Sequence, residues 1–291
     1  MVKTLKRPLG WMALATAVLL AACSTNSALV GTPGKETIHA LTQDLKLLTI
    51  NAGQPTRVLQ TVGIKGLPVT EFLVGIDYRV TRGVLYALAR SGRVYTINTE
   101  TGYVSPVGTV PVAATATALD GTAFGVDFNP AADRIRVVSN TGQNLRLHPD
   151  TGALVAVDTP LAFDLGDAQA DQKPQLLAAG YTYNKKDEKI TTNFAIDGRN
   201  GTLVRQGSVE GVLTVVSPNT GRLFTVGALG TGALVDASLD IADVSGVAFA
   251  ALRTSAQGPT QLYRVNLETG KAEVLGNVAS GAPLVGIAVI P

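Results

Sequence analysis

The sequence predicts an all-β fold of five repeated units that close into a ring. Short apolar or alternating runs recur about every 50 residues and are separated by Gly, Asn, Asp and Pro. No long window after the first 36 residues carries apolar residues at the i, i+3, i+4 and i+7 positions typical of a helix. The two ends of this region also look like complementary parts of a single unit.

The first marker of the repeat is a strand that ends in a glycine-containing turn. It occurs at Gly53, Gly102, Gly152, Gly201 and Gly270, at intervals of 49, 50, 49 and 69 residues. Glycine tolerates the positive φ that tight turns require, and a preceding Asn or Asp favours a turn. We interpret each occurrence as a hairpin inside one unit.

A second marker is a buried strand with a glycine near its centre. It occurs at Gly75, Gly125, Gly180, Gly246 and Gly286. In the two clearest repeats the turn glycine follows the strand glycine by 27 residues. Because two separate markers keep the same phase, the repeat is structural rather than a coincidence of composition.

A unit of about 50 residues with four strands has the size of a β-propeller blade, and the spacing gives five blades. The clearest unit is predicted to have strands at 72–80, 84–89, 93–98 and 103–110. The fourth unit is longer, and we place an extra hairpin there at about 209–219. An ordinary β-sandwich is the alternative, although a sandwich has no reason to keep a constant period.

The two ends of the repeat region predict how the ring closes. Leu284–Ile290 resembles an innermost strand without its companions, whereas His39–Gly63 resembles outer strands without an innermost one. Together they complete one blade, which would join the two ends of the ring and remove its open sheet edges.

The first 23 residues predict export and lipidation. Lys3, Lys6 and Arg7 precede the apolar run Trp11–Leu20, as in a secretory signal. This run is too short for a spanning helix, which needs about 20 apolar residues. The sequence Leu-Ala-Ala-Cys then resembles a bacterial lipobox, in which Cys23 is acylated, for example by palmitate. We therefore expect a signal at 1–22, a lipidated tether at 23–36 and the propeller-like domain at 37–291.

Composition narrows the class of protein. The formal charge of +2 includes three basic residues of the leader, so the exported chain is close to neutral. A nucleic-acid binder normally carries a clustered basic surface, so that class is disfavoured. Ser24 follows the cysteine where an Asp would signal inner-membrane retention, so we expect anchoring to the outer membrane. The domain would lie in the periplasm or at the cell surface, as a monomer with an unidentified protein or glycan partner.

Asp77 and Asp127 are the strongest candidates for chemistry. Each follows the strand glycine by two residues and so shares its strand face. The same position in the other units is assigned to Thr182, Ala248 and Ala288. Near a propeller channel, two carboxylates could hold a hard cation such as calcium or act as an acid–base pair. Alternatively, each only caps backbone amides or bonds to nearby side chains, the candidates being Asn129, Thr122 and Arg134.

Other polar residues suggest weaker sites. Arg134, Arg136 and Arg146 alternate along neighbouring strands of the third unit and could bind an anionic glycan or protein. A solvated outer face would give the same pattern. The two histidines, His39 and His148, are not accompanied by a motif for a metal site or a catalytic triad.

The segment Ala123–Asp150, which contains Phe-Gly-Val-Asp-Phe-Asn-Pro and Arg-Ile-Arg-Val-Val-Ser, resembles the bacterial family catalogued as domain of unknown function 4394. Leu85–Gly108 and Ser217–Gly230 are similar to the same family, and the likeness covers roughly residues 37–291. The resemblance implies a propeller-like domain that is often secreted or surface-associated. The family has no established reaction, so it supplies no catalytic residues.

Three functional hypotheses follow. The first is a non-enzymatic, lipid-anchored propeller that binds a partner in the cell envelope. The second is a propeller enzyme, a lactonase or lyase, with a divalent cation near Asp77 and Asp127. The third is a propeller that calcium stabilises without any catalysis.

Overall fold

A computed structural model describes residues 1–2, 31–108 and 118–291. The predicted leader and the lipidation site Cys23 lie outside these ranges, so they stay predictions. Among the residues that are described, no helix is both long enough and apolar enough to cross a membrane.

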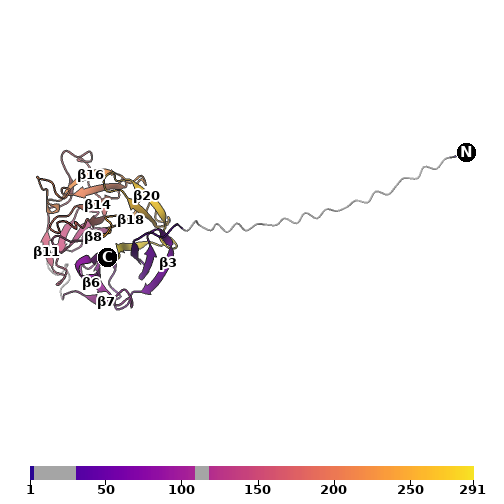
Figure 1. The fold of residues 1–291 in the computed structure, drawn as a ribbon, viewed down its shortest axis with the longest axis horizontal. Helices are drawn as coiled ribbons and strands as arrows, with labels where there is room; N and C mark the ends of the chain where they lie inside the picture. The colour runs from indigo at the N-terminus through magenta and orange to yellow at the C-terminus, as the bar shows by residue number, and fades with distance from the viewer. Residues whose placement is uncertain (3–30, 109–117) are drawn as a thin grey trace.

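Five sheets, antiparallel apart from one short outer strand, surround a central axis, as Figure 1 shows in a view onto the ring. Blade 1 contains β21 (Leu284–Val289), β1 (Thr37–Thr42), β2 (Lys46–Asn51) and β3 (Gln54–Gly63). Blade 2 contains β4 (Leu73–Arg79), β5 (Val84–Ala89), β6 (Val94–Ile97) and β7 (Val104–Pro106). Blade 3 contains β8 (Phe124–Asn129), β9 (Arg134–Ser139), β10 (Asn144–Leu147) and β11 (Leu154–Val157).

The last two blades differ slightly from the first three. Blade 4 contains β13 (Leu176–Tyr181), β14 (Asn193–Asp197), β15 (Thr202–Gln206) and β16 (Arg222–Ala228). A short fifth strand, β12 (Ala162–Phe163), adds to its outer edge parallel to β16. Blade 5 contains β17 (Asp236–Ile241), β18 (Ala248–Arg253), β19 (Gln261–Val265) and β20 (Ala272–Asn277). The five-bladed propeller predicted from the repeat is therefore confirmed.

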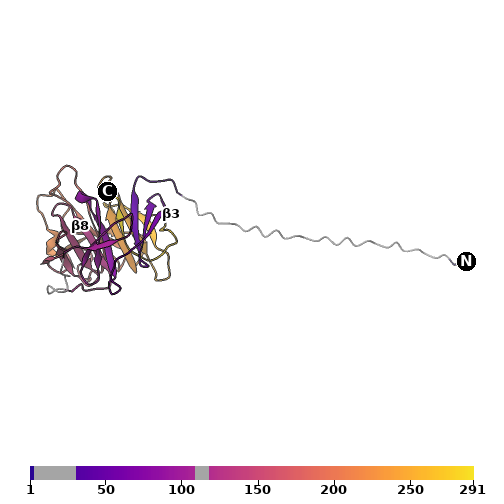
Figure 2. The same ribbon diagram turned by 90° about the horizontal axis from the view of Figure 1, so that it is seen from below.

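The ring closes within blade 1, as the sequence predicts. The C-terminal strand β21 pairs antiparallel with β1, with Ile38 opposite Val289 and Leu41 opposite Gly286. The innermost strand thus comes from one end of the domain and the three outer strands from the other. Figure 2 shows the disc from its side, with the C-terminus at one face.

The core lies between the blades. Blades 4 and 5, for example, pack Leu177 and Ile196 against Leu239 and Ala250, all of them buried. Because each sheet is covered by a neighbour on both faces, the inner strands are apolar along almost their whole length. This explains why the sequence shows continuous apolar runs as well as alternating ones.

Glycines on the inner strands let neighbouring blades approach closely. A Cβ atom added to Gly125 would lie 2.5 Å from backbone atoms of Ala178 and Ala179 in the next blade. A Cβ atom on Gly75 would lie 2.5 Å from the side chain of Val126. At these two positions, glycine is needed because the neighbouring blade leaves no space for a side chain.

We predict that Gly125→Ala lowers the free energy of unfolding by about 1–3 kcal/mol, because the methyl group overpacks a backbone-lined contact. Gly63→Ala is the control, since nothing lies within 4 Å of its added Cβ. Denaturant unfolding of both variants checks this. Equal stability of the two would show that blades 3 and 4 are less tightly packed than described.

Three details of the repeat were predicted wrongly. The Gly246 motif leads into β18, the second strand of blade 5, while β17 lies at the axis. Gly201 joins the second and third strands of blade 4, whereas Gly102 and Gly152 join the third and fourth strands of their blades. The extra hairpin at 209–219 is instead an irregular connection between β15 and β16, with one 3₁₀ turn, η3 (Pro218–Thr220).

Candidate metal centre

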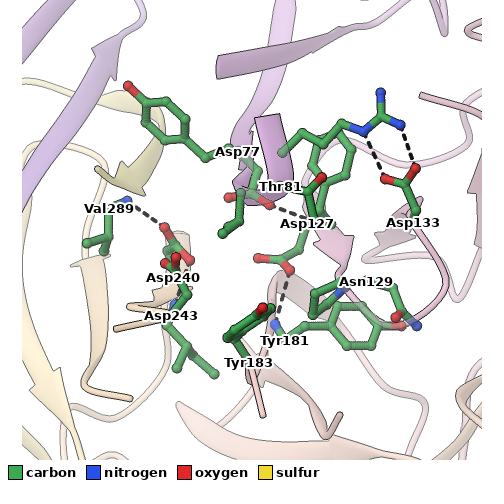
Figure 3. A pocket seen from close by; sticks show the side chains of 16 residues that line it. Asp77, Thr81, Asp127, Asn129, Asp133, Tyr181, Tyr183, Asp240, Asp243 and Val289 are labelled. Carbon is green, nitrogen blue, oxygen red and sulfur yellow. Dashed lines mark hydrogen bonds and ion pairs between the residues drawn. The ribbon is translucent and has the colours of Figure 1, made fainter. Parts of the chain in front are cut away.

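Three aspartate side chains converge at one end of the propeller axis (Figure 3). Asp77 comes from β4, Asp127 from β8 and Asp240 from β17, so each belongs to a different blade. One carboxylate oxygen from each lies within 4.8 Å of those of the other two. The three residues are only 6%, 3% and 8% exposed.

Backbone amides of neighbouring inner strands position the three carboxylates. Asp77 Oδ2 accepts a hydrogen bond from the N–H of Phe128 at 2.7 Å, and Asp127 Oδ1 accepts one from Tyr181 at 3.0 Å. Asp240 Oδ2 accepts one from Val289 at 2.5 Å. Each aspartate therefore links its own blade to the next inner strand.

These bonds agree in part with the simpler alternative from the sequence, in which the aspartates cap backbone amides. The partners are not Asn129, Thr122 or Arg134 but amides across the blade interface. For Asp127, Oδ1 makes the bond, and the other oxygen has no hydrogen bond among the described residues. That second oxygen is available to a ligand in the central space.

No basic side chain in the described part of the protein forms an ion pair with the three carboxylates. Arg79 lines the same cavity, but its guanidinium contacts Asp133 at 2.5 Å and Asp150 at 2.6 Å. The cluster therefore gathers up to three negative charges in a buried space without compensation. Such an arrangement is costly unless protons or a cation neutralise it.

The environment raises the pKa of all three carboxyl groups. Loss of hydration raises the pKa of Asp77 well above its usual range, and the charge of Asp240 adds to this. Burial, then the charges of Asp77 and Asp240, does the same to the pKa of Asp127. Burial raises the pKa of Asp240 to about 6. The cluster thus binds protons or another positive charge much more readily than free aspartates do.

The space between the carboxylates is small. Its volume is about 30 Å³, and Thr81, Tyr183 and Asp243 also line it (Figure 3). A single water needs about 10–15 Å³ by this kind of measure. The cavity can therefore hold an ion together with water.

The sequence placed Asp77 and Asp127 together correctly but missed Asp240. The aspartate position of blade 5 was given to Ala248, which lies in the second strand β18. In β17 the pattern Ser-Leu-Asp-Ile (238–241) matches Gly-Ile-Asp-Tyr (75–78), with serine in place of glycine. A search for a small residue, an aliphatic residue and then aspartate would have found Asp240.

In blade 4, the position equivalent to the aspartates was predicted two residues too late. Thr182 lies beyond the end of β13, and its hydroxyl donates to Glu210. Gly180 holds the aspartate position instead, because the next residue, Tyr181, donates to Asp127 as Phe128 donates to Asp77. In blade 1, Ala288 holds that position as predicted, since Val289 makes the equivalent bond to Asp240.

The three arginines do not form an exposed basic stripe. Arg136 is only 1% exposed, and its guanidinium contacts Asp158 and Asn219, each at 2.6 Å. Arg146 makes two bonds of 2.8 Å to the same Asp158, and Arg134 donates to backbone carbonyls of its own turn. The pattern arose because Arg136 points into a polar contact between blades 3 and 4.

Neither histidine lies in the aspartate cluster. His39 is buried in β1, and its Nδ1 lies 2.8 Å from the Tyr78 hydroxyl. Burial lowers the pKa of His39 to about 4. His148 Nδ1 accepts a bond from the N–H of Asp150 in a turn, as the equivalent Asn98 does with Glu100.

The fold and this site define a five-bladed propeller with a buried acidic cluster at its axis. The chain matches the family described as domain of unknown function (DUF4394) over residues 46–288, and it belongs to that family. The family predicted from the sequence motifs is thus confirmed.

Wider comparisons add little. No curated protein matches the chain significantly. Among solved structures, the crystal structure of a nidogen/laminin complex is similar with a TM-score of 0.45 and 10% identity, over 89% of this chain and 99% of the other. That degree of likeness is too low to bear on the function.

Proposed function

We propose that this protein is a lipid-anchored binding module of the cell envelope whose propeller is locked by a calcium ion at its axis. Asp77, Asp127 and Asp240 are the proposed ligands. The observation that carries the proposal is that three carboxylates from three blades share one buried space with no basic partner among the described residues.

The spacing of the oxygens allows one cation to contact all three carboxylates. Two ligands of one cation can be no further apart than twice the metal–oxygen distance, which is about 4.6–5.2 Å for calcium and about 4.2 Å for magnesium. The three carboxylate oxygens lie within 4.8 Å of one another, which is compatible with this limit for calcium. Calcium also accepts irregular sets of six to eight oxygens, so waters and Asp243, which lines the same cavity, could complete the shell.

The size of the cavity supports a structural role for the ion. A volume of about 30 Å³ is far below the roughly 300–1,000 Å³ that is typical of small-molecule sites. A lactonase or lyase would need its substrate to reach the metal. A bound ion would instead hold three inner strands together, which is what a rigid binding module requires. Attachment to the membrane rests on the lipobox-like sequence that ends at Cys23.

Thermal unfolding of the chain from Ser24 onward, which contains every strand of the ring, tests the calcium site. A ligand at a hundredfold excess over Kd stabilises the folded state by about 2.7 kcal/mol. For a domain of this size we expect calcium to raise the Tm by about 5–10 °C relative to chelator. Identical melting curves would contradict the proposal.

Asp197→Asn provides a matched control. Asp197 is also buried, at 1% exposure, and accepts backbone bonds from Gln175 and Arg199, but it lies outside the cluster. We expect this variant to be less stable than the wild type in both conditions while keeping the same calcium-induced rise in Tm.

A further inference from the structure

The other end of the propeller axis opens into a much larger cavity. Its volume is about 780 Å³, and it is lined where the inner strands of all five blades begin. Small-molecule sites typically measure about 300–1,000 Å³. This cavity, which we call the funnel, shares no lining residue with the aspartate cavity.

The walls of the funnel combine apolar and polar side chains. Leu177, Leu234 and Leu284 form buried parts of the lining. Phe72 and Val69 lie at the rim and are 69% and 98% exposed. Apolar side chains that line a concave surface commonly mark a ligand site, because their exposure to water is otherwise unfavourable.

Among the described residues that line the funnel, one basic side chain, Arg253, has donors to spare. Its side chain is only 13% exposed, and its Nε atom is buried with no hydrogen-bond partner in the described part of the chain. Nη2 lies 3.6 Å from Asp236 Oδ2, and Nη1 makes a 3.4 Å bond to the carbonyl of Ala256. A buried guanidinium usually forms short paired bonds to an anion, and Arg253 does not.

The acidic groups of the funnel do not form such short paired bonds with Arg253. Asp236 lies 3.6 Å from Arg253 Nη2, which is longer than a short paired bond, and burial raises the pKa of its carboxyl group. Glu71 already accepts bonds from Ser91 and Tyr95. The arginine therefore has capacity for an additional anionic partner inside the funnel.

We infer that the funnel binds a small organic carboxylate with an apolar body. The carboxylate would accept bonds from the Arg253 guanidinium, and the apolar part would pack on Leu177, Leu234 and Leu284. One arginine suits a monoanion better than a phosphate, which carries more charge. This site is separate from the proposed calcium site and does not depend on it.

Calorimetric titration with octanoate, octanol and octylamine tests the inference, because these probes differ only in the head group. We expect octanoate to bind at least about tenfold more tightly than the other two, since charge-assisted bonds to a guanidinium are among the stronger ones. Equal binding of all three, or no binding of octanoate, would overturn it.

Two arginine variants refine this test. Arg253→Gln is expected to weaken octanoate binding at least tenfold and octanol binding less than twofold, while Arg253→Lys should retain part of the preference. Arg264→Gln, which removes an exposed arginine of β19 that pairs with Glu273, should change the affinity for neither octanoate nor octanol. Unchanged octanoate affinity in a folded Arg253→Gln protein would overturn the assignment.

The aspartate cluster supplies the last control. Asp127→Asn should bind octanoate as the wild type does, with or without calcium, because Asp127 does not line the funnel. Loss of octanoate binding in Asp127→Asn would place the ligand elsewhere. Failure of calcium to stabilise the protein, by contrast, would leave the octanoate result unaffected.

Discussion

Asp127→Asn is expected to raise the stability of the calcium-free protein and to abolish its response to calcium. The amide oxygen of Asn can still accept the bond from the N–H of Tyr181, so the link between blades 3 and 4 is kept. One buried negative charge next to Asp77 and Asp240 is lost. Removal of an unpaired buried charge should contribute about 1–3 kcal/mol.

In the presence of calcium, the wild type should become more stable than Asp127→Asn. The wild type gains about 2.7 kcal/mol at a hundredfold excess over Kd, whereas Asp127→Asn lacks one ligand and gains little. Denaturant unfolding of both proteins, in calcium and after calcium removal, measures the four free energies of unfolding. If Asp127→Asn instead destabilises the calcium-free protein as Asp197→Asn does, the carboxylate serves only as a cap for backbone amides.

The second large effect is a loss of stability of the calcium-free protein as pH rises, which calcium should offset. In the calcium-free protein the pKa values of Asp77 and Asp127 are raised well above their usual range, and that of Asp240 is raised to about 6. Groups with a raised folded-state pKa stabilise fully below the unfolded value, about 3.9 for Asp. That contribution is lost as pH rises through the folded values. Stability should therefore fall from about pH 4 to pH 7 and beyond.

Calcium should offset this loss, because it replaces the protons that leave the carboxyl groups. The difference in Tm between calcium and calcium-free buffer should be near zero at about pH 4 and should grow as pH rises. Melting curves at each pH, with protein stripped of calcium beforehand, measure this difference. A difference that does not change with pH would argue against carboxylate ligands.

His39 makes stability depend on pH in the opposite direction. The difference in Tm between calcium and calcium-free buffer removes this contribution. Burial lowers its pKa to about 4, so its contribution to stability is lost as pH falls from about 6.5. His39 lies outside the aspartate cluster, so its effect is the same with and without calcium and cancels in the difference.

The fold could be predicted from sequence because its repeat is carried by local physical requirements. Gly75 and Gly125 are needed where blades approach, and turn glycines such as Gly102, with φ of 77°, are needed where the chain reverses. The ring closure followed from incomplete ends, since unpaired sheet edges are unfavourable. These requirements recur in each blade and so leave a periodic signal.

The site could be predicted only in part because its residues do not recur in every blade. Asp77 and Asp127 follow the strand glycine and were found, but β17 has Ser238 at that position and Asp240 was passed over. The unused donors of Arg253 depend on how its side chain lies against Asp236, its cross-strand neighbour in blade 5, and no sequence pattern encodes that geometry. The burial of Arg136 was hidden for the same reason, since its partner Asn219 is 83 residues away.

Calcium titration of the calcium-stripped chain from Ser24 onward, by calorimetry near neutral pH, tests the central claim most directly. We predict one calcium ion per chain in the wild type and in Asp197→Asn, and no binding in the double variant Asp77→Asn and Asp127→Asn. Absence of binding by the wild type at millimolar calcium, or equal binding by the double variant, would contradict a calcium ion at the propeller axis.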